Sequence, residues 1–218
     1  MTVPTDAPAL WAATHAERAA LADDLATLAP AQWATPSSCR DWTVEEVVAH
    51  LTAAASIGRW GWIAGMLGAR FDPGLHNARR LARHRGADPA QTLERFRAVV
   101  TSTVAPTGDT AAWLGEVVVH GEDVRRPLGL ARTPPVAATT AIARFFASRD
   151  FAVNSKRQVA GLRLEATDGP FAAGDGPRVT GPTLALVMVM AGRPAHLDDL
   201  DDPDGPGVAE LRERLVGR

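Results

Sequence analysis

The chain has 218 residues, 46% hydrophobic and 22% charged, which is typical of a folded globular protein and excludes a disordered one. Its formal charge of -2 gives no overall basic field and argues against nucleic acid or an anionic membrane as a partner. Cys39, the single cysteine, excludes an internal disulfide and every zinc site that needs two thiolates, so histidine and carboxylate side chains must hold any metal.

Targeting and membrane-spanning segments are not visible in the sequence. The first thirty residues carry several acidic side chains, whereas a signal peptide needs a basic start and an uninterrupted apolar run. The longest apolar stretch, 184–191, is far shorter than the roughly 20 residues that cross a bilayer. We therefore expect a cytoplasmic protein.

Two helices are predicted in the first third of the chain. Apolar residues at helical spacing predict a helix over 9–29, which Pro30 stops. Thr43 and Glu46 have the spacing of a capping box and predict the start of a second helix. This helix has an apolar stripe and a weak continuation toward Leu67, bent or broken at its glycines.

Two further helices complete a predicted bundle. A turn at 72–74 and a basic stretch, 76–85, lead to Asp88, which caps a helix that starts at Pro89. Asp109 opens the fourth helix, which ends near Gly129. Four helices joined by loops favour an antiparallel bundle, so residues 1–130 form the first predicted domain.

The remaining residues, 131–218, predict a small second domain that mixes helices and strands. The predicted elements are a helix over 136–151, a half-buried strand over 162–167, a hairpin rich in glycine and proline, a short strand over 178–180, an apolar helix or strand over 183–191, an acidic loop over 198–204 and a final helix over 208–215. The fold class is therefore α+β, a helical bundle followed by a small α+β domain.

The fourth predicted helix carries a carboxylate and an imidazole on one face. Glu116 and His120 are four residues apart, so both side chains can bind one ion. Asp123 lies beside them on the same helix. A buried unpaired carboxylate costs several kcal/mol, so Glu116 must be paired, protonated, exposed or bound to metal. By itself the spacing favours a solvated helix face or a simple hydrogen-bonded pair.

His50 extends this pattern, because it lies at the edge of the second helix's apolar stripe. One histidine on such a face is more often a satisfied core residue than a ligand. Together with Glu116 and His120, however, it would make the open three-ligand arrangement of catalytic zinc. Asp123 would then orient His120 through its second ring nitrogen.

Two stretches resemble signatures of the mycothiol-dependent maleylpyruvate isomerase family, a branch of the DinB-like four-helix metalloproteins. The first, Cys39-Arg-Asp-Trp-Thr-Val-Glu-Glu-Val-Val-Ala-His50-Leu, is similar to Cys-x-x-Trp-x-Val...His-Leu, and the second, Glu116-Val-Val-Val-His120-Gly-Glu-Asp123, is similar to Glu-x-x-x-His-x-x-Asp. The resemblance implies a divalent metal, usually zinc, on His50, Glu116 and His120. Gly181-Pro182 and Gly192-Arg193 are similar to the family's accessory C-terminal domain.

The resemblance also implies a reaction. Mycothiol adds to a cis double bond, rotation follows and the thiol leaves, while the metal lowers the pKa of the bound thiol. The expected partners are this low-molecular-weight thiol and a small electrophile, with a carboxylate that Arg193 binds through its planar guanidinium. Arg193 is equally well explained as a side chain that covers a helix end, and Cys39 as a small buried residue.

The sequence leaves two further questions open: the role of a basic cluster at 79–85, and whether the protein is an enzyme or a binding protein. Arg79, Arg80, Arg83, His84 and Arg85 form a local positive cluster that could attract an anionic substrate or cofactor, although a solvated helix face is the better default. The alternative to an enzyme is a non-catalytic metal- or ligand-binding regulatory protein on the same bundle, since no general base beyond the three ligands is evident. The sequence leaves substrate, native metal and oligomeric state undetermined.

Overall fold

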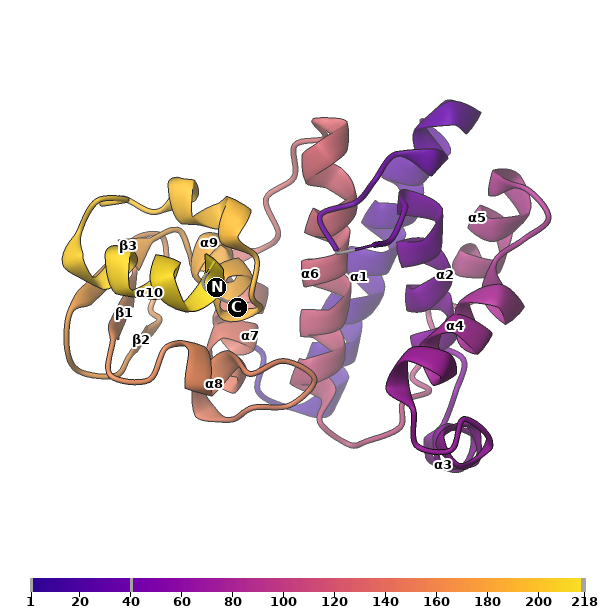
Figure 1. The fold of residues 1–218 in the computed structure, drawn as a ribbon, viewed down its shortest axis with the longest axis horizontal. Coiled ribbons are helices and arrows are strands. Elements are labelled where there is room, and N and C mark those ends of the chain that lie inside the picture. Colours follow the sequence, from indigo (N-terminus) through magenta and orange to yellow (C-terminus); the bar gives the residue numbers. More distant parts are fainter. Residues whose placement is uncertain (1, 40, 217–218) are drawn as a thin grey trace. The chain divides into compact units, whose positions relative to one another are not determined.

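The computed structural model describes residues 2–39 and 41–216, and the chain divides into two compact units. Trp11–Arg132 forms a helical unit, whereas the segment up to Leu10 and the chain from Thr133 onward form a unit of helices and a sheet (Figure 1). The fold class is therefore α+β, as the sequence predicts. Arg40, part of the loop before the second predicted helix, lies outside the described residues.

The helical unit is built almost entirely from α-helices. In chain order its elements are α1 (Ala7–Ala26), the 3-10 helix η1 (Pro30–Ala34), α2 (Val44–Ala54), α3 (Arg59–Gly68), α4 (Pro73–His84), α5 (Pro89–Arg97) and α6 (Thr110–Leu128). α1, α2, α5 and α6 correspond to the four helices that the sequence predicts. Their apolar faces share one core, to which α1 contributes Leu21 and Leu25, α5 contributes Phe96, and α6 contributes Val117.

α2 begins at the position that its capping box predicts, with Thr43 as the N-cap. The Thr43 hydroxyl accepts a hydrogen bond from the Glu46 backbone N–H, and the Thr43 N–H donates to Glu46 Oε2 at 2.8 Å. These reciprocal bonds satisfy backbone donors that the first helical turn leaves without partners. The register of α2 is thereby fixed, with Val44, Val47 and Val48 buried in the core and His50 at its edge.

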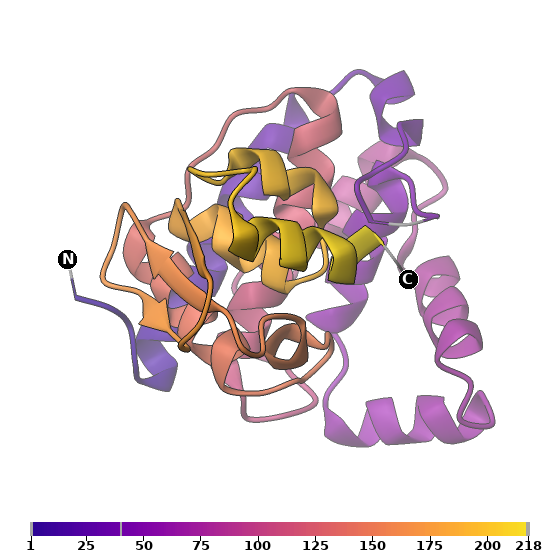
Figure 2. The same ribbon diagram turned by 60° about the vertical axis from the view of Figure 1, so that its left-hand side comes forward.

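Between α2 and α5 the structure differs from the sequence prediction. The weak continuation of the second helix is a separate helix, α3, because the helical conformation is interrupted over residues 55–58. The predicted turn at 72–74 is the start of α4, whose N-cap Asp72 accepts from the Leu75 N–H at 3.1 Å. α3, every residue of which is described, contains no buried residue, and Figure 2 shows α3 and α4 at one edge of the helical unit.

The second unit surrounds a small sheet. Its elements are α7 (Val136–Ser148), α8 (Ser155–Gln158), β1 (Arg163–Ala166), β2 (Ala172–Ala173), β3 (Arg178–Gly181), α9 (Thr183–Met190), the 3-10 helix η2 (Pro194–Asp199) and α10 (Pro206–Val216). Within the described residues β1 is the central strand, antiparallel to β2 and parallel to β3. The loop between β2 and β3 passes so close to the chain before β1 that a Cβ on Gly174, at φ +76, would lie 2.1 Å from Leu162 O.

α9 forms the buried centre of this unit. The sequence left 183–191 open between helix and strand, and the structure makes it a helix whose residues are almost all buried. It contacts α7 and two strands of the sheet, which explains its nearly uniform apolar sequence. Across the described chain, no helix combines the length and hydropathy needed to span a membrane.

Candidate functional site

The side chains of His50, Glu116 and His120 meet where α2 packs against α6. His50 Nε2 lies 2.7 Å from Glu116 Oε1, and His120 Nε2 lies 3.9 Å from the same oxygen. One ligand atom from each residue lies within 4.8 Å of the other two. The packing of α2 on α6 thus joins residues that are 66 positions apart in the chain.

A buried carboxylate sets the orientation of His120. The His120 ring is hydrogen-bonded through Nδ1 to Asp123 Oδ2 at 2.9 Å, and the Asp123 side chain has no exposed area. Because an ionised carboxylate can only accept, Nδ1 carries the proton. When the imidazole is neutral, its lone pair is therefore on Nε2, the nitrogen that faces Glu116.

The surroundings of His120 also favour its charged form when no cation is bound. Burial by itself disfavours the imidazolium, but hydrogen bonds to Asp123 and Cys39 and the negative charges of Glu116 and Asp123 outweigh it. The net effect raises the pKa of His120 to about 10. A site that stabilises a proton so strongly carries the negative charge that a metal cation also requires.

The donor set and spacing of the three side chains fit a divalent cation. Tetrahedral zinc ligands at about 2.0–2.2 Å from the metal are roughly 3.3 Å from each other. The separations of 2.7 and 3.9 Å at Glu116 Oε1 bracket this value, so small side-chain movements suffice. Two imidazoles and one carboxylate form the ligand set of catalytic zinc sites, which leave a position for an exogenous ligand.

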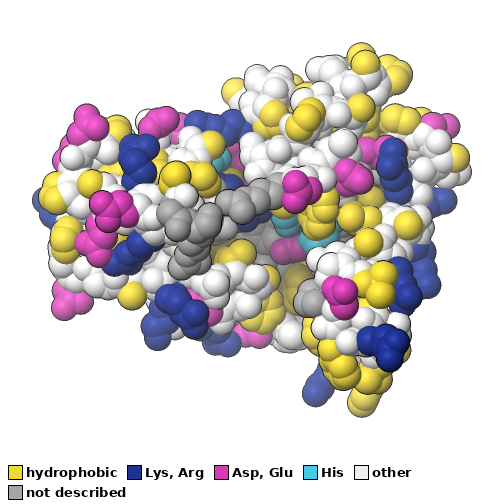
Figure 3. Space-filling view, in the orientation of Figure 1, with side chains coloured by type: hydrophobic (Ala, Val, Ile, Leu, Met, Phe, Trp, Pro, Cys, Tyr) yellow, Lys and Arg dark blue, Asp and Glu magenta, His cyan; other side chains and the backbone are white. Residues whose placement is uncertain are grey.

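The cluster is partly exposed to solvent. The side chains of His50 and Glu116 keep 14% and 20% of their area exposed, whereas that of His120 keeps 11%. Figure 3 shows histidine side chains at the surface beside acidic and hydrophobic ones. His120 is thus the least exposed of the three side chains, and the buried Asp123 carboxylate holds its ring in place.

Two residues near the cluster received no role in the sequence-based site. The Trp42 ring centroid lies 4.8 Å from that of His50 and 6.2 Å from that of His120, so the indole flanks both imidazoles. Cys39 is partly buried and has a hydrogen bond to His120, a contact that the sequence did not indicate. The signal available for Trp42 was its place in the Cys-x-x-Trp signature that begins at Cys39.

Arg193 lies in the second unit, at the N-cap of η2. Its Nη1 donates to Ala191 O at 2.7 Å, the carbonyl of the residue that follows α9. This contact matches the alternative explanation of an arginine that covers a helix end. A role for Arg193 in binding a substrate carboxylate stays a prediction.

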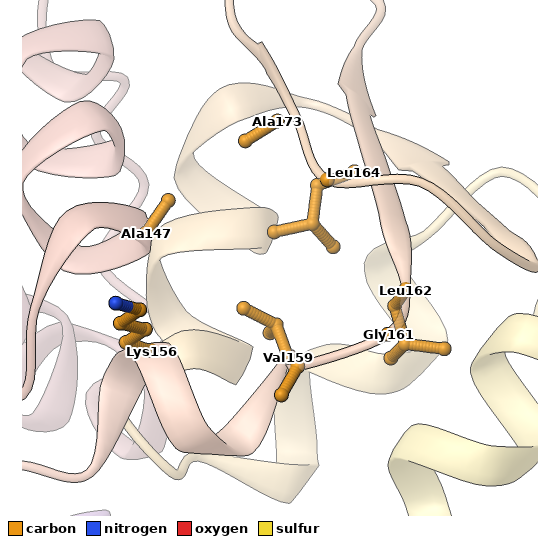
Figure 4. Close-up of a pocket in the computed structure, with 9 residues that line it drawn as sticks. Ala147, Lys156, Val159, Gly161, Leu162, Leu164 and Ala173 are labelled. Atoms are coloured by element: carbon orange, nitrogen blue, oxygen red, sulfur yellow. The ribbon is translucent and has the colours of Figure 1, made fainter.

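A hollow of about 180 Å³ in the second unit has a different character. Its lining comes from α7, α8, the segment between α8 and β1, β1, and the end of β2, and consists of alanine, valine, leucine and glycine residues together with Lys156 (Figure 4). This lining offers no pair of acid and base and no set of metal ligands. We therefore place the candidate chemistry in the helical unit.

Fold and site together define a class: a helical-bundle protein with a recessed His–Glu–His cluster suited to a cation. Residues 14–109 match the family model of the mycothiol maleylpyruvate isomerase N-terminal domain. The match includes His50 and ends before Glu116. This match and the similar solved structures support the resemblance to the mycothiol-dependent maleylpyruvate isomerase family that the signatures predict.

Solved structures confirm the fold of the whole chain. A crystal structure of the mycothiol-dependent maleylpyruvate isomerase is similar at a TM-score of 0.65 and 16% sequence identity, covering 93% of this chain and 96% of that one. A histidine-to-alanine mutant of the mycothiol-dependent maleylpyruvate isomerase is similar at the same TM-score and 15% identity, with the same coverage. A search of curated proteins finds no significant match.

Proposed function

We propose that this protein is an enzyme that uses a divalent cation, zinc in the first instance, and mycothiol to isomerise or transfer sulfur to a small electrophile, as a maleylpyruvate isomerase does. The observation that carries the proposal is the convergence of His50, Glu116 and His120 in a cluster that is partly exposed to solvent. The match of residues 14–109 to the mycothiol maleylpyruvate isomerase N-terminal domain supports the choice of thiol.

In this proposal each side chain has a separate task. His50, Glu116 and His120 would hold the cation, and Asp123 keeps the Nε2 lone pair of His120 directed toward Glu116. Trp42 covers the imidazoles and restricts the water around them. The bound cation would supply one kind of chemistry, a lowered thiol pKa that makes the thiolate available at neutral pH.

The proposed reaction consumes no further reactant. The thiolate forms a carbon–sulfur bond to one carbon of a cis double bond, and the electron pair of that double bond moves onto the conjugated carbonyl. Rotation about the resulting single bond follows, the electron pair returns and the carbon–sulfur bond breaks. The product is the trans isomer and the thiolate is regenerated.

The sulfur in this reaction belongs to the cosubstrate. Cys39 groups with His120 and Asp123, whereas the three candidate ligands form a second group that does not include Cys39. A freely diffusing thiol is kept reduced in the cytoplasm, which agrees with the location expected from the sequence.

The test is a turnover assay of purified, zinc-loaded protein with a cis enedioic acid or ester, followed by NMR of the cis and trans isomers. We expect isomerisation that requires both mycothiol and zinc and that is lost in Glu116→Gln. Affinity for mycothiol without turnover of any electrophile would instead support the alternative, a non-catalytic binding or regulatory protein.

A further inference from the structure

The basic cluster that the sequence singles out, 79–85, lies at the end of α4, and its arginines have different surroundings. Arg79 Nη1 donates to Gly68 O at 2.7 Å and so holds the end of α3. Arg85 Nε donates to Glu45 Oε2 at 2.8 Å, which ties α4 to α2. Arg83 is exposed to solvent. Contacts within the fold or with water account for these three side chains.

Arg80 differs from the other arginines of the cluster. Its side chain is partly buried, and its Nε is withdrawn from solvent with no hydrogen-bond acceptor among the described residues. Burial lowers the pKa of Arg80, while the negative charge of Glu116 raises it. The guanidinium nevertheless stays charged at neutral pH, because an arginine cannot be deprotonated there. A positive charge on α4 therefore acts on Glu116 in the candidate site, and α2, which carries His50, contacts both α4 and α6.

His84 and Glu116, whose charges interact with that of Arg80, do not provide the positive charge that Arg80 carries. His84 is also partly buried, and burial together with the charges of Arg80, Arg83 and Arg95 lowers its pKa, so it is neutral near pH 7. Glu116 already accepts a hydrogen bond from His50 and is one of the candidate metal ligands. Its carboxylate therefore has partners other than Arg80. Of the two partly buried basic residues at the end of α4, Arg80 and His84, Arg80 is therefore the one that is positively charged at neutral pH.

A purely structural role explains Arg80 poorly. Leaving a buried donor without an acceptor destabilises the folded state, and an apolar side chain at the same position would avoid this cost. A ligand carboxylate would satisfy the Nε and a terminal nitrogen together, since the guanidinium fork matches its two oxygens. We propose that Arg80 binds a carboxylate of the electrophilic substrate beside the His50–Glu116–His120 cluster. This inference rests on the proposed function and is independent of the prediction made for Arg193.

The inference is tested with two ligands that differ in one charge. Monomethyl fumarate carries one carboxylate, and dimethyl fumarate has the same skeleton without it. Binding of each to zinc-loaded protein in the absence of thiol is measured by isothermal titration calorimetry, so the readout needs no turnover. The wild type should bind the monoester at least ~10-fold more tightly than the diester, a factor typical of a charge-assisted hydrogen bond.

Arg80→Met removes the charge and keeps an unbranched side chain, and Arg83→Met on the exposed face of the same helix is the matched control. Arg80→Met should weaken monoester binding by ~10-fold or more and leave the diester unchanged, with Arg80→Lys in between. Arg83→Met should match the wild type for both. The zinc content should be the same in all variants, and the melting temperature of Arg80→Met should equal or exceed that of the wild type.

Turnover separates this inference from the proposed function. With monomethyl maleate and dimethyl maleate, Arg80→Met should raise KM for the monoester alone. If the wild type isomerises neither ester, the proposed function fails while the binding comparison still decides the role of Arg80. Equal wild-type affinity for the two fumarates, or equal losses in Arg80→Met and Arg83→Met, would overturn the assignment.

Discussion

His120 Nδ1 lies 2.9 Å from the fully buried carboxylate of Asp123, one turn along the same helix. The contact fixes which nitrogen of His120 is protonated and turns the other toward Glu116. A backbone contact anchors the same segment, because Asp123 O accepts from the Ser38 N–H at 2.9 Å. The orientation of His120 therefore depends on Asp123 as much as on α6 itself.

Replacing Asp123 by asparagine should loosen the metal site without removing a ligand. The amide can no longer supply a charged acceptor to Nδ1, so we expect zinc affinity to fall by roughly 10–100-fold, the range for outer partners of metal-bound histidines. Competition against a chromophoric chelator at fixed pH measures this change.

The control for this variant is the adjacent residue. Glu122→Gln alters a neighbouring buried carboxylate that belongs to neither metal-ligating group, and it should leave zinc affinity within twofold. An Asp123→Asn protein that binds zinc as tightly as the wild type would contradict the proposed role of Asp123.

Glu122 should make the stability of the fold depend on pH. The side chain is 10% exposed, its Oε1 lies 3.7 Å from Arg125 Nη1, and that oxygen has no hydrogen bond from any described residue. Burial raises the pKa of Glu122 to about 7, helped by Glu17 and Asp123 and opposed by Arg125 and Arg126.

The sign of the effect follows from proton counts. Between the ordinary pKa of 4.5 and the folded value of about 7, the unfolded state binds fewer protons than the folded state. The free energy of unfolding should therefore fall as the pH rises through this window, by about 2–3 kcal/mol, and level off above it. Glu122→Gln removes this contribution.

Urea unfolding at pH 5 and pH 8 gives the comparison. Glu122→Gln should match the wild type at pH 5 and exceed it by about 2 kcal/mol at pH 8. Glu94→Gln, on the exposed face of α5, should follow the wild type at both values. The same difference between Glu122→Gln and wild type at the two pH values would contradict the raised pKa.

The bundle core should be sensitive to cavity formation at Phe96. This side chain is fully buried among residues from α1, α2 and α6, and its truncation to alanine should cost about 3–5 kcal/mol of unfolding free energy. Phe71→Ala deletes the same atoms from a side chain that is 69% exposed and should change stability by less than about 0.5 kcal/mol. Equal losses in chemical denaturation would count against the assigned core.

Cys39 should be dispensable as a nucleophile. A serine hydroxyl is similar in size and can also hydrogen-bond to His120, so we expect Cys39→Ser to retain thiol-dependent isomerisation within a few-fold of the wild type. Both proteins should be inactive without added thiol. Activity of the wild type without thiol, together with its loss in Cys39→Ser, would place the reactive sulfur in the protein.

The parts of this structure that follow from local chemistry could be predicted from the sequence. The Thr43–Glu46 capping box and the Gly129 cap in the left-handed conformation, at φ 66, both lie where their patterns indicate. The four-residue spacing of Glu116 and His120 likewise places both side chains on one face. Each of these features depends on residues within one or two turns.

Features that depend on distant contacts could not be predicted in the same way. The Asp72–Pro73–Gly74 sequence reads as a turn, but Asp72 caps α4, and the helix is retained by packing on α2. The single partly buried arginine of the basic cluster looks like its neighbours in sequence, since only the packing of α4 distinguishes Arg80 from Arg83. The contact of Cys39 with His120 depends in the same way on the docking of a loop against α6.

Metal analysis of the purified protein, alongside His50→Ala and His120→Ala, tests the central claim most directly. Elemental analysis after dialysis against zinc and a buffer wash should give one zinc per wild-type chain and a large loss in each variant, while circular dichroism shows that both remain helical. Stoichiometric zinc retained in both variants would contradict the assignment of His50, Glu116 and His120 as the metal site.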